Sequence, residues 1–177
     1  MAVQAEAVAA SPLVGGAQTA LHSHAGGGGG PSTLKKTADQ IINGTAFRDI
    51  TDLAFAVSIN TDYAFKFYIV FRSAATTTGF RFGVLAPTGA VLDFFMTYQT
   101  VANATTAGVA TWLQGHWVSG EAMAALTATI AAGVDLVCMI EGRVKVAATS
   151  GTLAARVASE LANDNLVVQK GSWGIWF

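Results

Sequence analysis

Two histidines near the N-terminus have the only short spacing in the sequence that suggests metal coordination. His22 and His24 flank Ser23, and residues two apart on an extended chain project to the same side. One chain offers two imidazoles, whereas three chains around a threefold axis would offer six, an octahedral set that suits iron or nickel. The alternative is a polar segment that binds no metal. We predict no other cofactor.

The remaining reactive groups form no catalytic arrangement in the sequence. Cys138, the single cysteine, lies on the apolar side of an alternating segment, where a thiol behaves as a small hydrophobe. As a nucleophile it would need His116 as its base. The glycine run 26–30 lacks the preceding strand and the lysine spacing of a phosphate-binding loop, and no pair of acids suggests glycosidase chemistry. We therefore predict that the protein is not an enzyme.

A tryptophan-rich segment near the middle of the chain is a candidate sugar-binding platform. Aromatic faces of Trp112 and Trp117 could pack against pyranose rings while His116 and Gln114 bind hydroxyl groups. The alternative is a buried or interfacial strand. Trp112 and Trp117 are candidate partner-binding residues in both interpretations.

The elements that must position these residues are strands. In residues 63–71 an aromatic or apolar side chain recurs at every second position, a spacing that a helix would scatter around its axis. Residues 152–160 and 166–169, separated by an Asn-Asp-Asn cluster, predict a hairpin. Similar alternation elsewhere predicts eight or nine strands and no long helix. We expect an all-β fold, a jelly-roll-like antiparallel sandwich.

The domain organisation follows from the glycine run. Residues 1–36 are predicted to form an extended or weakly helical arm and a glycine-rich linker, and residues 37–177 the sandwich. Leu21 on the arm is a further candidate for partner binding. The chain end is unusual because Trp173, Trp176 and Phe177 are aromatic where termini are normally polar. A partner is expected to cover them.

The amino-acid composition limits the classes of molecule that the protein is expected to bind. Hydrophobic residues make up 52% of the chain and charged residues only 12%, about half the usual 25% or so, which leaves few ions to cover an isolated surface. The net charge of −1, with only Lys35-Lys36 as an adjacent basic pair, argues against nucleic-acid binding. No apolar run is long enough to span a membrane, and the N-terminus does not read as a signal peptide.

Two longer segments carry a family resemblance. NTDYAFKFYIVFRSAATTTGFRF at 60–82, and the ASE and VVQKGSWG pieces near the C-terminus, resemble a β-sandwich domain of tailed-bacteriophage structural proteins. That group includes capsid-decoration, head-fibre and tail-fibre modules. The resemblance covers roughly residues 37–177, except for about 101–121.

The resemblance implies a virion protein, assembled in the bacterial cytoplasm and attached non-covalently through its N-terminal arm. The implied partners are copies of itself in a homotrimer and other virion proteins such as the major capsid protein. His-x-His pairs occur in similar phage fibres, which agrees with the metal hypothesis for His22 and His24. The alternative function is a receptor-binding tail-fibre module that holds a host-surface glycan.

Overall fold

The computed structural model describes residues 30–76, 78–100, 111–118, 132–163 and 165–177, with the backbone alone for Thr100 and 111–118. The chain divides into two units, Met1–Gly30 and Pro31–Phe177, and the second contains all of the described strands. The strand Ser32–Lys35 belongs to the second unit and precedes residue 37, the predicted start of the sandwich. This strand pairs with the C-terminal strand, a contact between distant segments that local sequence patterns do not reveal.

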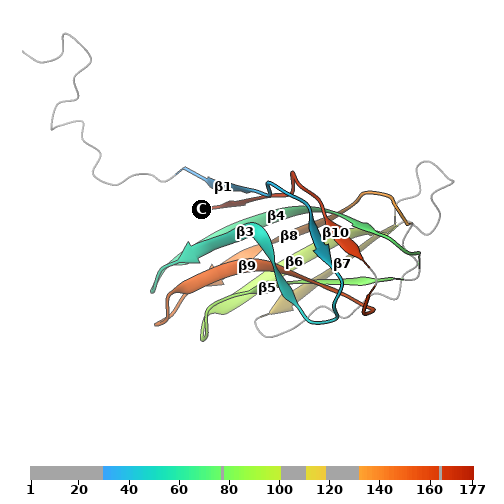
Figure 1. Ribbon diagram of the computed structural model, residues 1–177. Coiled ribbons are helices and arrows are strands. Elements are labelled where there is room, and N and C mark those ends of the chain that lie inside the picture. The colour runs from blue at the N-terminus through green and yellow to red at the C-terminus, as the bar shows by residue number, and fades with distance from the viewer. Residues whose placement is uncertain (1–29, 77, 101–110, 119–131, 164) are drawn as a thin grey trace, which may run out of the picture. The chain divides into compact units, whose positions relative to one another are not determined.

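Among the described residues there are eleven strands and no helix (Figure 1). The strands are β1 (Ser32–Lys35), β2 (Gln40–Ile42), β3 (Arg48–Val57), β4 (Asp62–Ser73), β5 (Phe80–Leu85), β6 (Val91–Thr100), β7 (Thr111–Val118), β8 (Leu136–Lys145), β9 (Gly151–Ser159), β10 (Leu166–Val168) and β11 (Trp173–Trp176).

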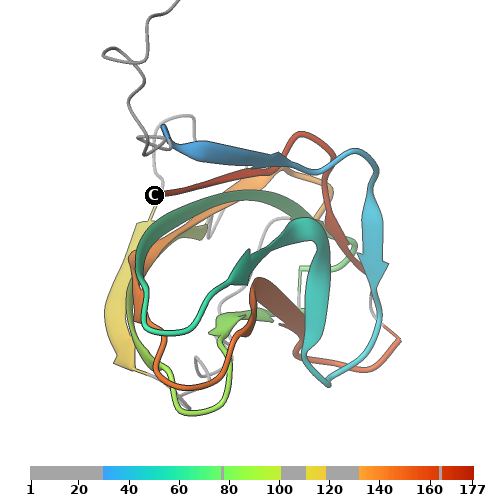
Figure 2. The same cartoon turned by 90° about the vertical axis from the view of Figure 1, so that its left-hand side faces the viewer.

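The strands form two sheets. The larger follows the path β1-β11-β4-β8-β6-β7, with β10 beside β4 and β2 beside β10, and the smaller is β3-β9-β5. The pairings between these strands are antiparallel. Figure 2 shows the sheets curving around a shared core. The predicted all-β sandwich is confirmed. Its jelly-roll connectivity stays a prediction, because the described strands divide into eight and three.

The aromatic stripe of β4 forms the centre of the core. Its inward side chains are at most 3% exposed: Phe65, Phe67, Ile69 and Phe71. The ring of Phe71 lies 4.3 Å from that of Phe80 and 5.2 Å from that of Phe82, both on β5. Because β4 and β5 belong to different sheets, these contacts join the two layers. The alternation predicted for residues 63–71 is therefore confirmed.

The predicted hairpin between residues 152–160 and 166–169 is wrong. Strand β9 is the centre of the smaller sheet, whereas β10 lies between β2 and β4 in the larger one. Strand β9 pairs with β3 along one edge and with β5 along the other. Its outward residues Ala154 and Ala158 are as buried as its inward ones, so both of its faces are covered. The connection after β9 therefore crosses between sheets.

Candidate interaction surface at the C-terminal strand

The C-terminal strand β11 divides its aromatic residues between core and surface. Trp176 stacks on Phe55 of β3, with ring centroids 4.6 Å apart and planes 10° apart, and it packs against the core. Trp173 lies on the opposite face and is 38% exposed, and Phe177, just beyond the strand, is 61% exposed. The N–H of Phe177 donates to the carbonyl of Ala64 over 3.0 Å, which holds the chain end on β4. Trp173 and Phe177 thus offer free apolar surface, while Trp176 mainly supports the fold.

A buried serine anchors the turn that leads into β11. The N–H of Val70 on β4 donates to Ser172 Oγ over 3.0 Å, and Ser172 Oγ donates to the carbonyl of Gln169 over 2.9 Å. Ser172 has no exposed surface. Gly171, at φ +86°, adopts the left-handed backbone that the turn requires. The Ser172 hydroxyl thus accepts a hydrogen bond from the backbone of β4 at the point where the pairing of β4 changes from β10 to β11.

A buried lysine follows β1 and ties it to β3. Lys36 is 2% exposed, and its Nζ donates to Gln40 Oε1 at 3.1 Å and to the carbonyl of Thr51 at 3.3 Å. Burial lowers the pKa of the Lys36 amine, and the negative charges of Asp52 and Asp39 oppose this effect. The two adjacent lysines therefore differ in their environment, because Lys35 is exposed and Lys36 is buried.

An irregular stretch of β3 faces this lysine. The pairing of β3 with β9 shifts between Asp49 and Ala54, and Asp52 within it has φ +69°. Asp52 Oδ2 accepts hydrogen bonds from the N–H of Thr37 at 3.0 Å and from its hydroxyl at 2.8 Å. These bonds lower the pKa of the Asp52 carboxyl. The arrangement fixes the start of the domain against β3.

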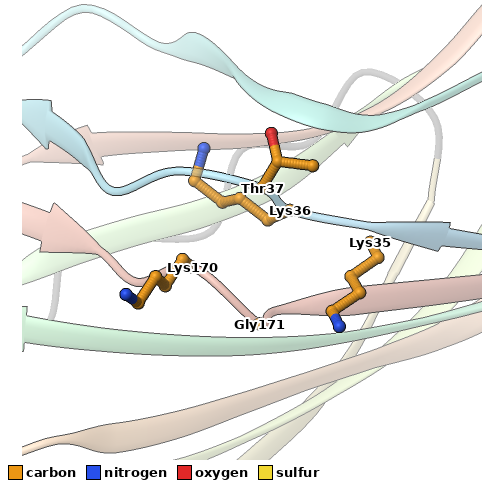
Figure 3. Close-up of a pocket in the computed structure, with 5 residues that line it drawn as sticks. All are labelled: Lys35, Lys36, Thr37, Lys170 and Gly171. Carbon is orange, nitrogen blue, oxygen red and sulfur yellow. The ribbon is translucent and has the colours of Figure 1, made fainter.

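Three lysines line an open pocket beside this region (Figure 3). Lys35, Lys36 and Lys170 surround a volume of about 530 Å³ together with Thr37 and Gly171. Figure 3 shows the three amino groups pointing in different directions. Its lining includes no acid, histidine or thiol. The three amino groups therefore do not converge on one point of the pocket.

The face of the larger sheet that is turned away from the core carries an apolar band. The band consists of partly or largely exposed side chains from four strands: Tyr68, Val70, Phe95, Met139, Trp173 and Ile175. Strand register aligns several of them in a row, with Trp173 opposite Tyr68 and Tyr68 opposite Met139. We call these six residues the outer band.

Most charges beside the outer band are paired across strands, whereas Lys35, opposite Trp173 on the edge strand β1, is exposed. Lys66 Nζ lies 3.3 Å from a carboxylate oxygen of Glu141, its register partner on β8. Arg143 lies 3.1 Å from a carboxylate oxygen of Asp93, its register partner on β6. Such exposed pairs contribute little to stability. They do, however, make this part of the sheet locally neutral.

The smaller sheet differs because the chain itself covers part of its outer face. The ring of Phe47 lies over Gly83 of β5, with its nearest carbon 3.6 Å from where a Cβ would stand. The guanidinium carbons of Arg81 and Arg156 lie 5.2 Å and 5.9 Å from the centre of the same ring. Arg156 also forms an ion pair with Asp49 at 2.9 Å. No comparable cover lies on the outer band among the residues that the structure describes.

The remaining predicted site residues fall in different places. His22, His24 and Leu21 lie outside the described residues. The backbone of Trp112 pairs with that of Gln99, and the backbone of Trp117 pairs with that of Phe94, a buried core residue. In the described part of the chain, no three His, Cys, Asp or Glu side chains are grouped to hold a metal ion.

The thiol of Cys138 is completely buried, and this burial raises its pKa well above the usual value. It therefore stays protonated, in agreement with its interpretation as a small hydrophobe. Within the described ranges, no helix is long and apolar enough to cross a membrane.

Sequence reasoning missed Tyr68 and Met139 of the outer band. The inward stripe of β4 was evident, but the outward positions between Lys66 and Arg72 are also apolar, and that signal pointed to the second face. A strand that is apolar on both faces has two surfaces to cover. The burial of Lys36 could have been predicted, because neighbouring residues of an extended chain face opposite sides and Lys35 and Lys36 are neighbours.

Comparisons with known proteins identify no family. No family model matches the chain, and no curated protein matches it. A solved structure entitled "Structure of infectious bursal disease virus Gx strain" aligns at 11% identity with a TM-score of 0.19. The alignment covers 84% of this chain, and the chain spans only 39% of that one. A similarity this weak carries no argument about fold or function.

Proposed function

We propose that this protein is a structural component of a tailed-phage virion, a capsid-decoration or head-fibre protein. It attaches non-covalently through its N-terminal arm, and it acts without catalysis. The observation that supports this proposal best is the exposed apolar surface made by Trp173, Phe177 and the outer band on a rigid β framework. The sequence resemblance of residues 60–82 and of the C-terminal segment points to the same class.

The mechanism is burial of apolar surface between subunits. A specific interface buries roughly 800 Å² per partner, and each Å² of apolar surface contributes about 25 cal/mol before the costs of association. Ordering an arm rich in Gly and Ala costs about 1–2 kcal/mol per residue. A single arm therefore binds weakly. In a trimer the three arms raise one another's effective concentration, and the combined attachment becomes stable.

Truncation of the arm tests this proposal. We expect that deleting residues 1–30 leaves a folded, trimeric domain that no longer copurifies with virions. The matched control replaces His22 and His24 by alanine in the full-length chain, which should keep attachment while removing any metal found by elemental analysis. A truncated chain that still copurifies with virions would refute the role of the arm.

A second candidate is a glycan-binding tail-fibre module, and the exposed stack of Trp173 on Tyr68 favours it. Aromatic side chains on an open sheet can hold the apolar face of a sugar. A glycan array separates the two functions. Specific binding that is lost in Trp173→Ala or Trp117→Ala would support the glycan function, and no binding by the intact protein would leave the structural one.

A further inference from the structure

We infer that the outer band is the surface through which copies of this chain assemble. The inference rests on the proposed function and adds the surface that holds the oligomer together. The band combines Tyr68, Met139 and Trp173 in one cross-strand row, with Val70, Phe95 and Ile175 beside it. Phe95 is 37% exposed and Trp173 38%, although both are large apolar side chains.

Charge complementarity favours a second copy as the occupant. Most ions next to the band are already paired within the chain: Lys66 with Glu141, Arg143 with Asp93 and Arg72 with Asp135. Lys35, in register with Trp173, is exposed on the edge strand β1. A partner with a strong net charge of one sign therefore finds no patch of opposite charge on this face. Burying the band against an identical copy leaves these three pairs intact, and Lys35, at the edge of the face, can keep its amine in water. The contact therefore buries no unpaired charge, which would be costly. A mainly apolar face whose other charges are paired is suited to its own equivalent.

The size of the face also suits an interface between copies. The path from β1 to β6 crosses four strand spacings, or about 19 Å, and residues 64–72 of β4 extend over about 26 Å. The projected area is on the order of 500 Å², and side-chain relief raises the accessible area toward the roughly 800 Å² per partner of a specific interface. The smaller sheet offers less, because Phe47 already covers part of it.

The test is the oligomeric state of the full-length chain, measured by sedimentation equilibrium. We expect the wild type to form a defined oligomer and Met139→Glu to raise its dissociation constant at least about 100-fold, because a charge then enters the buried centre. The control is Ile59→Glu, which places the same charge on a residue that is 50% exposed in the turn after β3. It should leave the oligomer intact. A monomeric wild type, or an oligomer that Met139→Glu does not weaken, would overturn the inference.

A second measurement needs no substitution and so does not depend on the variant folding. Hydrogen peroxide converts accessible methionine to its sulfoxide. In the assembled wild type Met139 should oxidise at least about tenfold more slowly than after dilution to monomers. Met96, which has no exposed surface, is the internal control and should be protected in both states. Equal oxidation of Met139 at both concentrations would count against assembly through this face.

The outcomes also separate this inference from the proposed function. A monomer that still copurifies with virions contradicts assembly through the outer band and leaves the virion role standing. An oligomer that depends on Met139 but is missing from virions supports the interface and contradicts the virion role. Protection of Met139 only in the presence of virions assigns the band to another virion protein and overturns the inference.

Discussion

Trp173 stacks on Tyr68 across the junction of β11 and β4, with ring centroids 5.7 Å apart and planes 12° apart. Three residues later, Trp176 stacks on Phe55 on the other side of the same sheet. One short strand thus contributes an aromatic ring to the core and another to the surface. The same segment stabilises the fold and offers a surface for partners.

Replacing the two tryptophans should separate these roles. Trp176→Ala removes a ring packed against the core and should lower the free energy of unfolding by about 3 kcal/mol. Trp173→Ala removes a surface stack and should cost about 1 kcal/mol, while weakening association of the copies. Urea denaturation of both variants, at a concentration where the chain is monomeric, measures the difference. Equal losses would show that the two sides of β11 are not distinct.

Ser172→Ala should destabilise the domain although it removes only one oxygen. The N–H of Val70 loses its acceptor in a buried position, and an unsatisfied buried donor costs about 1–3 kcal/mol. Ser58→Ala, at an exposed position, should have almost no effect. Thermal and urea unfolding of the two variants provide the measurement, and a neutral Ser172→Ala would mean that another group satisfies Val70.

Gly142→Ala tests the close approach of β8 and β6. A Cβ at this position would lie 2.3 Å from the carbonyl oxygen of Asp93 and 2.7 Å from Cα of Phe94. Both atoms belong to the backbone of β6, so the two strands must separate. We expect the free energy of unfolding to fall by at least about 2 kcal/mol. Gly44→Ala is the control, since nothing lies within 4 Å of its added Cβ. Similar stabilities of the two variants would contradict the tight packing.

Lys36 should make stability depend on alkaline pH. Burial lowers its pKa in the folded protein below the ordinary 10.5. Between the lowered value and 10.5 the unfolded chain binds more protons than the folded one, so the free energy of unfolding rises with pH in that interval. Lys36→Met should abolish this rise, while Lys35→Met, at an exposed position, should keep it. Urea unfolding at several pH values up to 10.5 measures it, and identical pH profiles for wild type and Lys36→Met would contradict the assignment.

The sequence allowed prediction of the strands more than of their partners. Alternation in β4 and β8 marked the inward residues, because the period of two is a local property of a strand. It could not reveal that β9 and β10 belong to different sheets, or that Ser32–Lys35 pairs with the chain end. Those pairings join residues between 69 and 144 positions apart in the sequence.

The candidate surface was only partly predictable. Three aromatic residues at the chain end indicated an interaction site, but their division between core and surface depends on the register of β11 against β4. Ser172 and Lys36 each bond to the backbone of another strand, Ser172 to Val70 on β4 and Lys36 to Thr51 on β3. Such bonds leave no periodic pattern in a sequence.

We propose that the chain serves as a structural part of a virus particle. Quantitative mass spectrometry of purified mature virions, with isotope-labelled peptides of this chain as standards, tests it most directly. We expect a fixed copy number, in multiples of three, that remains after washing at high salt because apolar contacts are not screened. A chain that is absent from mature virions, or present only in trace and variable amounts, would contradict this structural role.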